Sequence, residues 1–197
     1  MTENGFEYVD LGLPSKTMWA TCNVGANKKE EPGLLFQFGS IVGYRYGDEN
    51  HRFKQKGIVS YSHKKYNAHE TLDLNDDAAH VNMGGTWRMP TLDQTRELYL
   101  YTNRNVKKIN GMKGMLFTSK INNKKIFFPF SGYWEYYSNT FNYINKRTHI
   151  WISEVPDFTK DGYLMYCYSN GTNNCIGDLS VHYAYSIRGV FNASECF

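Results

Sequence analysis

The side chains best suited to chemistry are four cysteines, six histidines and one dense group of acids. A catalytic dithiol needs a close cysteine pair in an electropositive setting that favours the thiolate. The cysteines show no C-x-x-C spacing and no such setting is evident around them, and sequence cannot rank their three pairings. They are Cys22, Cys167, Cys175 and Cys196. Free thiols are therefore expected, and thiol catalysis is not.

Potential metal ligands are concentrated in one short segment, which comprises Asp73, Asn75, Asp76, Asp77 and His80. Hard cations favour clustered oxygens, but this segment lacks the glycine and the distal glutamate of a calcium loop. A helix start explains the acids, because carboxylates complement the helix dipole. His51, His63 and His69 are irregularly spaced in a polar segment, which favours exposed histidines over a zinc site. No metal and no cofactor are therefore predicted.

Other signatures of catalysis are also missing from the sequence. There is no nucleophile elbow with a Ser, His and Asp constellation, and no phosphate-binding glycine loop follows a strand. The net charge of +3 is small and the basic residues are scattered, so nucleic-acid binding is not expected. No stretch approaches the roughly 20 apolar residues of a membrane span, so membrane insertion is not expected either. These observations predict that the protein is not an enzyme.

The N-terminal stretch "MTENGFEYVDLGLPS" has an acidic start and no apolar core, unlike a secretory signal. The expectation is a protein made in a cytoplasm that stays there, or leaves it inside a larger particle or by lysis. A bacterial cell surface is the alternative if a leader has been removed.

The pattern along the chain predicts one domain over residues 1–197, with a long polar loop at about 48–74. Apolar runs divided by Gly, Asn and Pro predict short strands. These runs are 8–15, 17–26, 33–47, 114–119, 124–133, 148–154, 162–169 and 186–191. Asn122-Asn123 is typical of a hairpin turn.

Two helices are predicted among these strands. The first is capped by Asp73 or Asn75 and ends at Gly84. The second begins after Thr91, which forms a capping box with Gln94. One or two short helices on antiparallel sheets with long loops define an α+β fold class.

The junction "GGTWRMPT" (84–91) precedes the second helix directly. Gly84 and Gly85 allow backbone conformations that other residues resist, and Trp87 is a large apolar anchor. Arg88 either binds a ligand or pairs with a carboxylate or carbonyls, and the structural role is favoured because it stands between a tryptophan and a proline. The junction is thus interpreted as a structural corner.

Tyr, Asn, Ser and Gly are concentrated in two segments, "GYWEYYSNTFNYINKRTH" (132–149) and "YCYSNGTNNCIGDLSVHYAYS" (166–186). This mixture is typical of adaptable recognition surfaces, since Tyr supplies rigid contact area and Asn and Ser supply hydrogen bonds. Aromatic faces with amide side chains also suit sugar rings. The alternative is that about half of these tyrosines point inward as core, and both interpretations stay open for each one.

The order of "YVDLGLPSKTMWATCNVGA", "FQFG", "LDLNDDAAHVNMGGTWRMPT", "FFPFSGY", "WISE" and "SIRGVF" resembles a family of C-type-lectin-like domains of gut anaerobes and their phages. That family is similar to a paralogous surface-domain group of a rumen fibre-degrader, and distantly to the formylglycine-generating-enzyme type of lectin fold. The Glu-Pro-Asn or Gln-Pro-Asp loop and the Trp-Asn-Asp triplet of calcium-dependent lectins are absent, so calcium-mediated sugar recognition is not expected. In relatives diversified by retroelements, the C-terminal segment binds the ligand. The resemblance therefore implies a ligand-binding set of Tyr166, Tyr168, Asn170, Asn173, Asn174, His182, Tyr183 and Tyr185.

The expected function is a non-enzymatic phage virion protein for receptor binding and host attachment, which recognises a bacterial surface protein or glycan through this Tyr and Asn-rich face. Multivalency, from a homotrimer or from many copies on a particle, would raise its avidity. Two alternatives remain open. One is a structural virion protein, such as a capsid decoration, head-fibre or tail-assembly module that contacts other virion proteins. The other is a bacterial surface-exposed binding domain.

Overall fold

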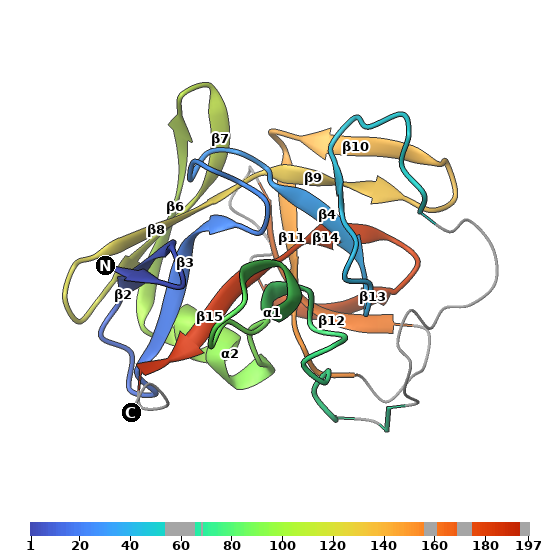
Figure 1. Cartoon of the computed structure of the whole chain (residues 1–197). Helices are drawn as coiled ribbons and strands as arrows, with labels where there is room; N and C mark the ends of the chain where they lie inside the picture. Colours follow the sequence, from blue (N-terminus) through green and yellow to red (C-terminus); the bar gives the residue numbers. More distant parts are fainter. Residues whose placement is uncertain (54–65, 68, 156–160, 169–174, 194–197) are drawn as a thin grey trace.

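Antiparallel strand pairs dominate the structure (Figure 1), a computed structural model that describes residues 1–53, 66–67, 69–155, 161–168 and 175–193. The described residues form fifteen strands but only two helices, of six and nine residues. The α+β prediction is therefore wrong, and the fold is β-rich with curled sheets. Two helices this short cannot form a layer of their own, and polar segments that carry no apolar run add further strands.

The strands are arranged in three sheets. A four-stranded sheet has the order β1-β2-β3-β15, formed by Thr2–Glu3, Phe6–Asp10, Thr17–Asn23 and Arg188–Asn192. A three-stranded sheet has the order β6-β7-β8, formed by Thr102–Ile109, Met112–Ser119 and Lys125–Pro129. The largest sheet has the order β13-β12-β11-β9-β14-β4-β5, formed by Cys175–Ser180, Asp161–Tyr168, Arg147–Trp151, Ser131–Glu135, Ala184–Ser186, Leu34–Gln37 and Tyr44–Arg45. Strand β10 (Thr140–Ile144) joins it by pairing with β9.

The hairpin predicted at Asn122-Asn123 is confirmed. It joins β7 to β8, the Ser119 N–H donates to the Lys124 carbonyl at 2.8 Å, and Asn123 has the positive φ of 61° that such turns require. Strand β6, which pairs with β7 along its whole length, was not predicted. Its sequence, TNRNVKKI, is mostly polar because the strand lies at the edge of its sheet.

The two helices lie at either side of the GGTWRMPT junction. Helix α1 (Ala78–Met83) ends at Gly84 as predicted, but its cap is Asp77 and not Asp73 or Asn75. Helix α2 (Leu92–Leu100) has the predicted capping box between Thr91 and Gln94. Of the acids before α1, Asp77 therefore serves the helix start, and its side chain accepts the His80 N–H.

Arg88 connects the junction to its surroundings, as the structural interpretation predicted. Its Nε donates to Asp77 Oδ2 at 2.9 Å and its Nη2 donates to the Leu72 carbonyl at 2.6 Å. The fully buried Asp77 carboxylate also accepts the Met89 N–H at 2.9 Å. Trp87 is buried and donates its indole N–H to the Glu3 carbonyl at 2.9 Å. The corner is therefore held by buried hydrogen bonds and by a buried ring.

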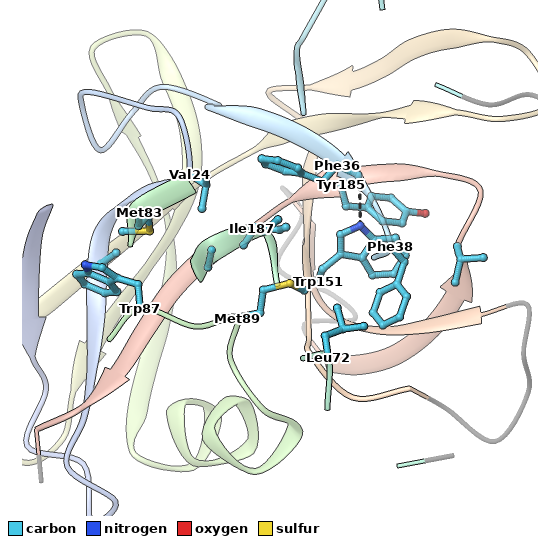
Figure 2. Packing of buried hydrophobic residues seen from close by; sticks show 14 of the residues in the cluster. Val24, Phe36, Phe38, Leu72, Met83, Trp87, Met89, Trp151, Tyr185 and Ile187 are labelled. Carbon is cyan, nitrogen blue, oxygen red and sulfur yellow. Dashed lines mark hydrogen bonds between the residues drawn. The ribbon is translucent and has the colours of Figure 1, made fainter. Parts of the chain in front are cut away.

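The largest apolar cluster joins the four-stranded sheet, the largest sheet and α1 (Figure 2). Trp151, on β11, donates its indole N–H to the Phe36 carbonyl on β4 at 2.7 Å. Tyr185, on β14, lies against Trp151 with ring centroids 4.7 Å apart and is fully buried. Strand β14 pairs with β4, β9 and β11, and all three of its side chains are buried.

A second buried link is Arg188, on β15, which is fully buried. Its Nε donates to Asn23 Oδ1 at 2.9 Å, and Nη1 and Nη2 donate to the Ala20 and Phe127 carbonyls at 2.9 and 3.0 Å. The guanidinium also lies 4.4 Å from the centroid of the Phe128 ring. Since Phe127 and Phe128 belong to β8, Arg188 connects the four-stranded and three-stranded sheets.

Within the described parts of the chain, no three His, Cys, Asp or Glu side chains are grouped closely enough to hold a metal ion. Asp76 accepts the Tyr66 hydroxyl at 2.6 Å, and His51 packs among aromatic rings. His63 lies outside the described residues. None of the helices among the described residues is both long and apolar enough to cross a membrane.

Candidate functional site

The β9–β10 hairpin has two chemically distinct faces. Directly paired residues share a face of such a ribbon, and Trp134 pairs with Phe141 on the inner face, where both pack near Phe53. On the outer face Tyr133 pairs with Asn142, and Glu135 pairs with Thr140. The inner face packs on the molecule through Trp134 and Phe141, and the outer face carries the largely buried Tyr133 ring and three polar side chains.

Tyrosines from separate segments gather around this outer face. Tyr133 lies between Tyr143 and Tyr183, with ring centroids 5.3 and 5.9 Å away and interplanar angles of 29° and 13°. Tyr137, at the hairpin tip, is 83% exposed and stands at 85° to Tyr183 with the centroids 6.2 Å apart. We call this surface the aromatic face; it consists of Tyr133, Tyr136, Tyr137, Tyr143, His182 and Tyr183.

His182 and Tyr136 extend the aromatic face along the hairpin. Their rings stack with centroids 4.8 Å apart at 25°, and Tyr136 meets Tyr137 at 71°. Each ring of the face therefore contacts another ring, and these contacts restrict the side-chain conformations in the free protein. Such preorganisation lowers the entropy that binding must overcome.

Arg147, at the start of β11, supports the stack from one side. Its Cζ lies 3.5 Å from the centroid of Tyr143 and 5.0 Å from that of Tyr133, and its Nη2 donates to the Tyr133 hydroxyl at 2.9 Å. Burial raises the pKa of Tyr133 to about 12, although the Arg147 guanidinium acts in the opposite direction. Burial, together with the Glu135 carboxylate, also raises the pKa of Tyr183. Both phenols therefore remain protonated at neutral pH and can donate hydrogen bonds.

Glu135 is the acid of the outer face. Its Oε2 accepts the Ser138 hydroxyl at 2.9 Å and the Asn142 amide at 3.0 Å. The Asn142 amide and the Ser138 hydroxyl also contact the Thr140 hydroxyl, at 2.7 and 2.6 Å. No protein donor reaches Glu135 Oε1 from the described residues. One oxygen of a fixed carboxylate is thus open to an outside donor.

Tyr143 has an unusual backbone for its residue type. Its φ is +66°, in the left-handed region, whereas most other non-glycine residues with positive φ in the described chain are asparagines. Asparagine tolerates this conformation, but a bulky residue is disfavoured there. Strained backbone that the surroundings hold in place is often found at functional sites.

The residues expected to bind a ligand are distributed unevenly. His182 and Tyr183 belong to the aromatic face, whereas Tyr185 lies fully buried beneath it and cannot contact a ligand. On β12 the backbone of Tyr166 pairs with His149 and that of Tyr168 pairs with Arg147, next to the face. Asn170, Asn173 and Asn174 lie outside the described residues.

Four rings, Arg147 and Glu135 were not named as site residues from the sequence. They belong to the segment 132–149, whose composition had indicated recognition, but composition does not rank its members. Burial does not alternate along β9, because Ser131 to Trp134 are all buried and Glu135 is half-buried, so no period-2 pattern of exposure singled out these residues. The two Tyr-rich segments of the sequence thus meet at one surface.

Cys22, on β3, is a free, half-buried thiol that lines a cavity of about 260 Å³ with Glu7 and Asn27. No aromatic-face residue lines this cavity, so the thiol and the aromatic face are separate features.

Comparison with protein families, curated proteins and solved structures finds no match to this chain. The resemblance to C-type-lectin-like domains therefore stays a prediction from the sequence, and the functional argument depends on the geometry of the aromatic face.

Proposed function

We propose that this protein is a non-enzymatic binding domain that attaches to a ligand displayed on a bacterial surface, as a phage receptor-binding protein would, and that the aromatic face is its contact surface. The observation that carries the proposal is the stack of Tyr143, Tyr133 and Tyr183 beside the exposed Tyr137. Large rigid aromatic side chains with hydroxyl and amide neighbours supply contact area and hydrogen bonds at low entropic cost.

The exposure of Tyr137 favours recognition over packing. A tyrosine that is 83% exposed at a hairpin tip contributes little to the core, and its removal leaves the buried Trp134 and the partly buried Phe141 in place. Nearby hydroxyls and amides let the same surface satisfy the polar groups of a ligand. Tyr137 and Tyr183 are therefore proposed to contact the ligand, and the inner face of the β9–β10 hairpin is proposed to hold them in position.

The test is binding of the fluorescently labelled protein, multimerised on a carrier, to a panel of gut anaerobe cells. The Tyr137→Ala/Tyr183→Ala variant is compared with Tyr101→Ala. Tyr101 is the C-cap of α2, a helix that lies far from the β9–β10 hairpin in Figure 1, and it is 38% exposed, so it controls for loss of an exposed ring. Circular dichroism establishes that each variant is folded.

Strain-selective binding that is lost in the double variant and kept in Tyr101→Ala would support the proposal. Binding to no strain by the multimerised wild type, with stable association to another virion protein, would contradict it and would favour the structural virion role.

A further inference from the structure

We infer that the ligand of the aromatic face is a neutral carbohydrate. This inference rests on the proposed function and names the ligand class of the same surface. It depends on three features of the β9–β10 hairpin: the exposed ring faces, the open oxygen of Glu135, and the sign of the charge that this oxygen carries.

The exposed rings fit the apolar faces of a sugar. A pyranose presents C–H groups on its flat faces, and aromatic rings bury such groups with favourable packing. Tyr137, beside Tyr183, is 83% exposed, and Tyr143, stacked on the more buried Tyr133, is 38% exposed. Because Tyr183 also stacks on Tyr133, with an interplanar angle of 13°, the platform is already formed in the free protein.

The polar groups of the same face fit the hydroxyls of a sugar. Glu135, Thr140 and Asn142 belong to the face that carries Tyr133, and the Ser138 hydroxyl joins their network. Glu135 Oε1 can accept a ligand hydroxyl, and hydrogen bonds to an ionised carboxylate are about twice as strong as neutral ones. A ligand that meets both groups at once needs apolar C–H faces and several hydroxyls within a small volume, which describes a sugar ring.

The charge distribution selects against acidic sugars. Glu135 is the carboxylate of the outer ribbon face, and an unpaired anion brought beside it is repelled. The Arg147 guanidinium does not offset this repulsion by pairing with Glu135, because it lies against the Tyr143 ring and donates to Tyr133. A sugar without carboxylate, sulfate or phosphate is therefore preferred.

The test measures binding of the multimerised protein to immobilised glycans. One set contains neutral oligosaccharides of hexoses and N-acetylhexosamines, and the other contains sialylated, uronic-acid and sulfated chains. Wild type is compared with Glu135→Gln, which keeps the shape of the side chain and removes its charge, and with Tyr137→Ala. Tyr101→Ala is the control, and thermal unfolding establishes that all four proteins are folded.

The expected result is binding to one or more neutral glycans and weak or no binding to acidic ones. Glu135→Gln should weaken neutral binding about tenfold, as expected for the loss of a charge-assisted hydrogen bond. The same change should reduce the difference in binding affinity between neutral and acidic glycans. A purely structural role of Glu135 would not produce this effect.

Three results would overturn the inference. Preference for acidic glycans would contradict the role of the Glu135 charge. Binding to cells that depends on Tyr137, without binding to any glycan, would indicate a protein ligand and leave the binding function intact. Absence of binding to both cells and glycans would contradict the inference and the proposed function together.

Discussion

Replacing Tyr143 by glycine or by alanine separates its backbone strain from its contacts. Both changes remove the ring, and with it the stack on Tyr133 and the contact with Arg147. An aromatic pair contributes ~0.5–1.5 kcal/mol and an exposed cation–π contact ~0.5–1 kcal/mol, so a loss of about 1–2 kcal/mol is expected for alanine.

Glycine should recover part of this loss. A non-glycine residue at φ +66° destabilises the folded protein by ~1–2 kcal/mol, a strain that glycine relieves. Glycine in turn destabilises the folded protein by about 0.5–1 kcal/mol, because it gives the unfolded chain more conformational entropy to lose. Tyr143→Gly should therefore be more stable than Tyr143→Ala by about 0.5–1 kcal/mol. Urea unfolding followed by tryptophan fluorescence measures the difference.

Lys107, an exposed residue in the middle of β6 without positive φ, provides the matched control. At that position glycine should be less stable than alanine by about 0.5–1 kcal/mol, the opposite sign. If Tyr143→Ala were as stable as Tyr143→Gly, or more stable, residue 143 would not be strained and the reasoning would be refuted. Both Tyr143 variants should bind cells equally weakly, because the ring is absent from each.

Three further predictions concern buried polar groups and are measured by urea unfolding. Asp77→Ala should cost about 2–4 kcal/mol, because it removes a helix cap and leaves the buried Met89 N–H and the part-exposed Arg88 guanidinium without their acceptor, and Asp77→Asn should cost less. Arg188→Met should cost about 3 kcal/mol or more, because it leaves three buried acceptors unsatisfied. The control Arg104→Met removes a part-buried guanidinium from Tyr99 and should cost about 1 kcal/mol. Similar losses of stability in the two variants would contradict the role of Arg188. Burial lowers the pKa of His149 to about 3, so between pH about 6.5 and 3 only the unfolded chain takes up a proton at this residue. The free energy of unfolding should therefore fall by about 2 kcal/mol between pH 7.5 and 5.0. An equal fall in the His149→Gln variant would exclude His149 as the cause.

Local signals in the sequence predicted the elements whose geometry is local. The capping box of Thr91 and Gln94 and the Asn122-Asn123 hairpin depend on residues close in sequence, and the corner before Arg88 begins with Gly84 and Gly85, whose positive φ reflects the conformational freedom of glycine. Such features survive in almost any tertiary context, and sequence patterns therefore identify them.

Features that depend on the pairing of distant strands could not be predicted from local sequence signals. Tyr183 and Tyr185 are two residues apart and would share one face of a regular strand, yet Tyr183 lies in the aromatic face and Tyr185 in the core. The reason is that β14 begins at Ala184 and is enclosed by β4, β9 and β11. Which tyrosine reaches the surface is decided by those neighbours, and the composition of the segment does not specify them.

The aromatic face also depends on contacts between segments far apart in the chain. Tyr133 and Tyr183 meet because β9 pairs with β14, and nothing within either segment specifies that pairing. The β-rich fold was not predicted for a related reason. An edge strand such as β6 is held by hydrogen bonds to one neighbouring strand, so its sequence needs no apolar run.

The four-stranded sheet contains both the first strand, β1, and the last, β15, whereas the β9–β10 hairpin belongs to the largest sheet and projects from the other side of the molecule in Figure 1. A fluorescent protein, an affinity tag or a self-assembling cage subunit fused near Thr2 or Asn192 would therefore leave the hairpin uncovered. The domain is thus suited to oriented immobilisation on sensors and beads, with no need to redesign its loops.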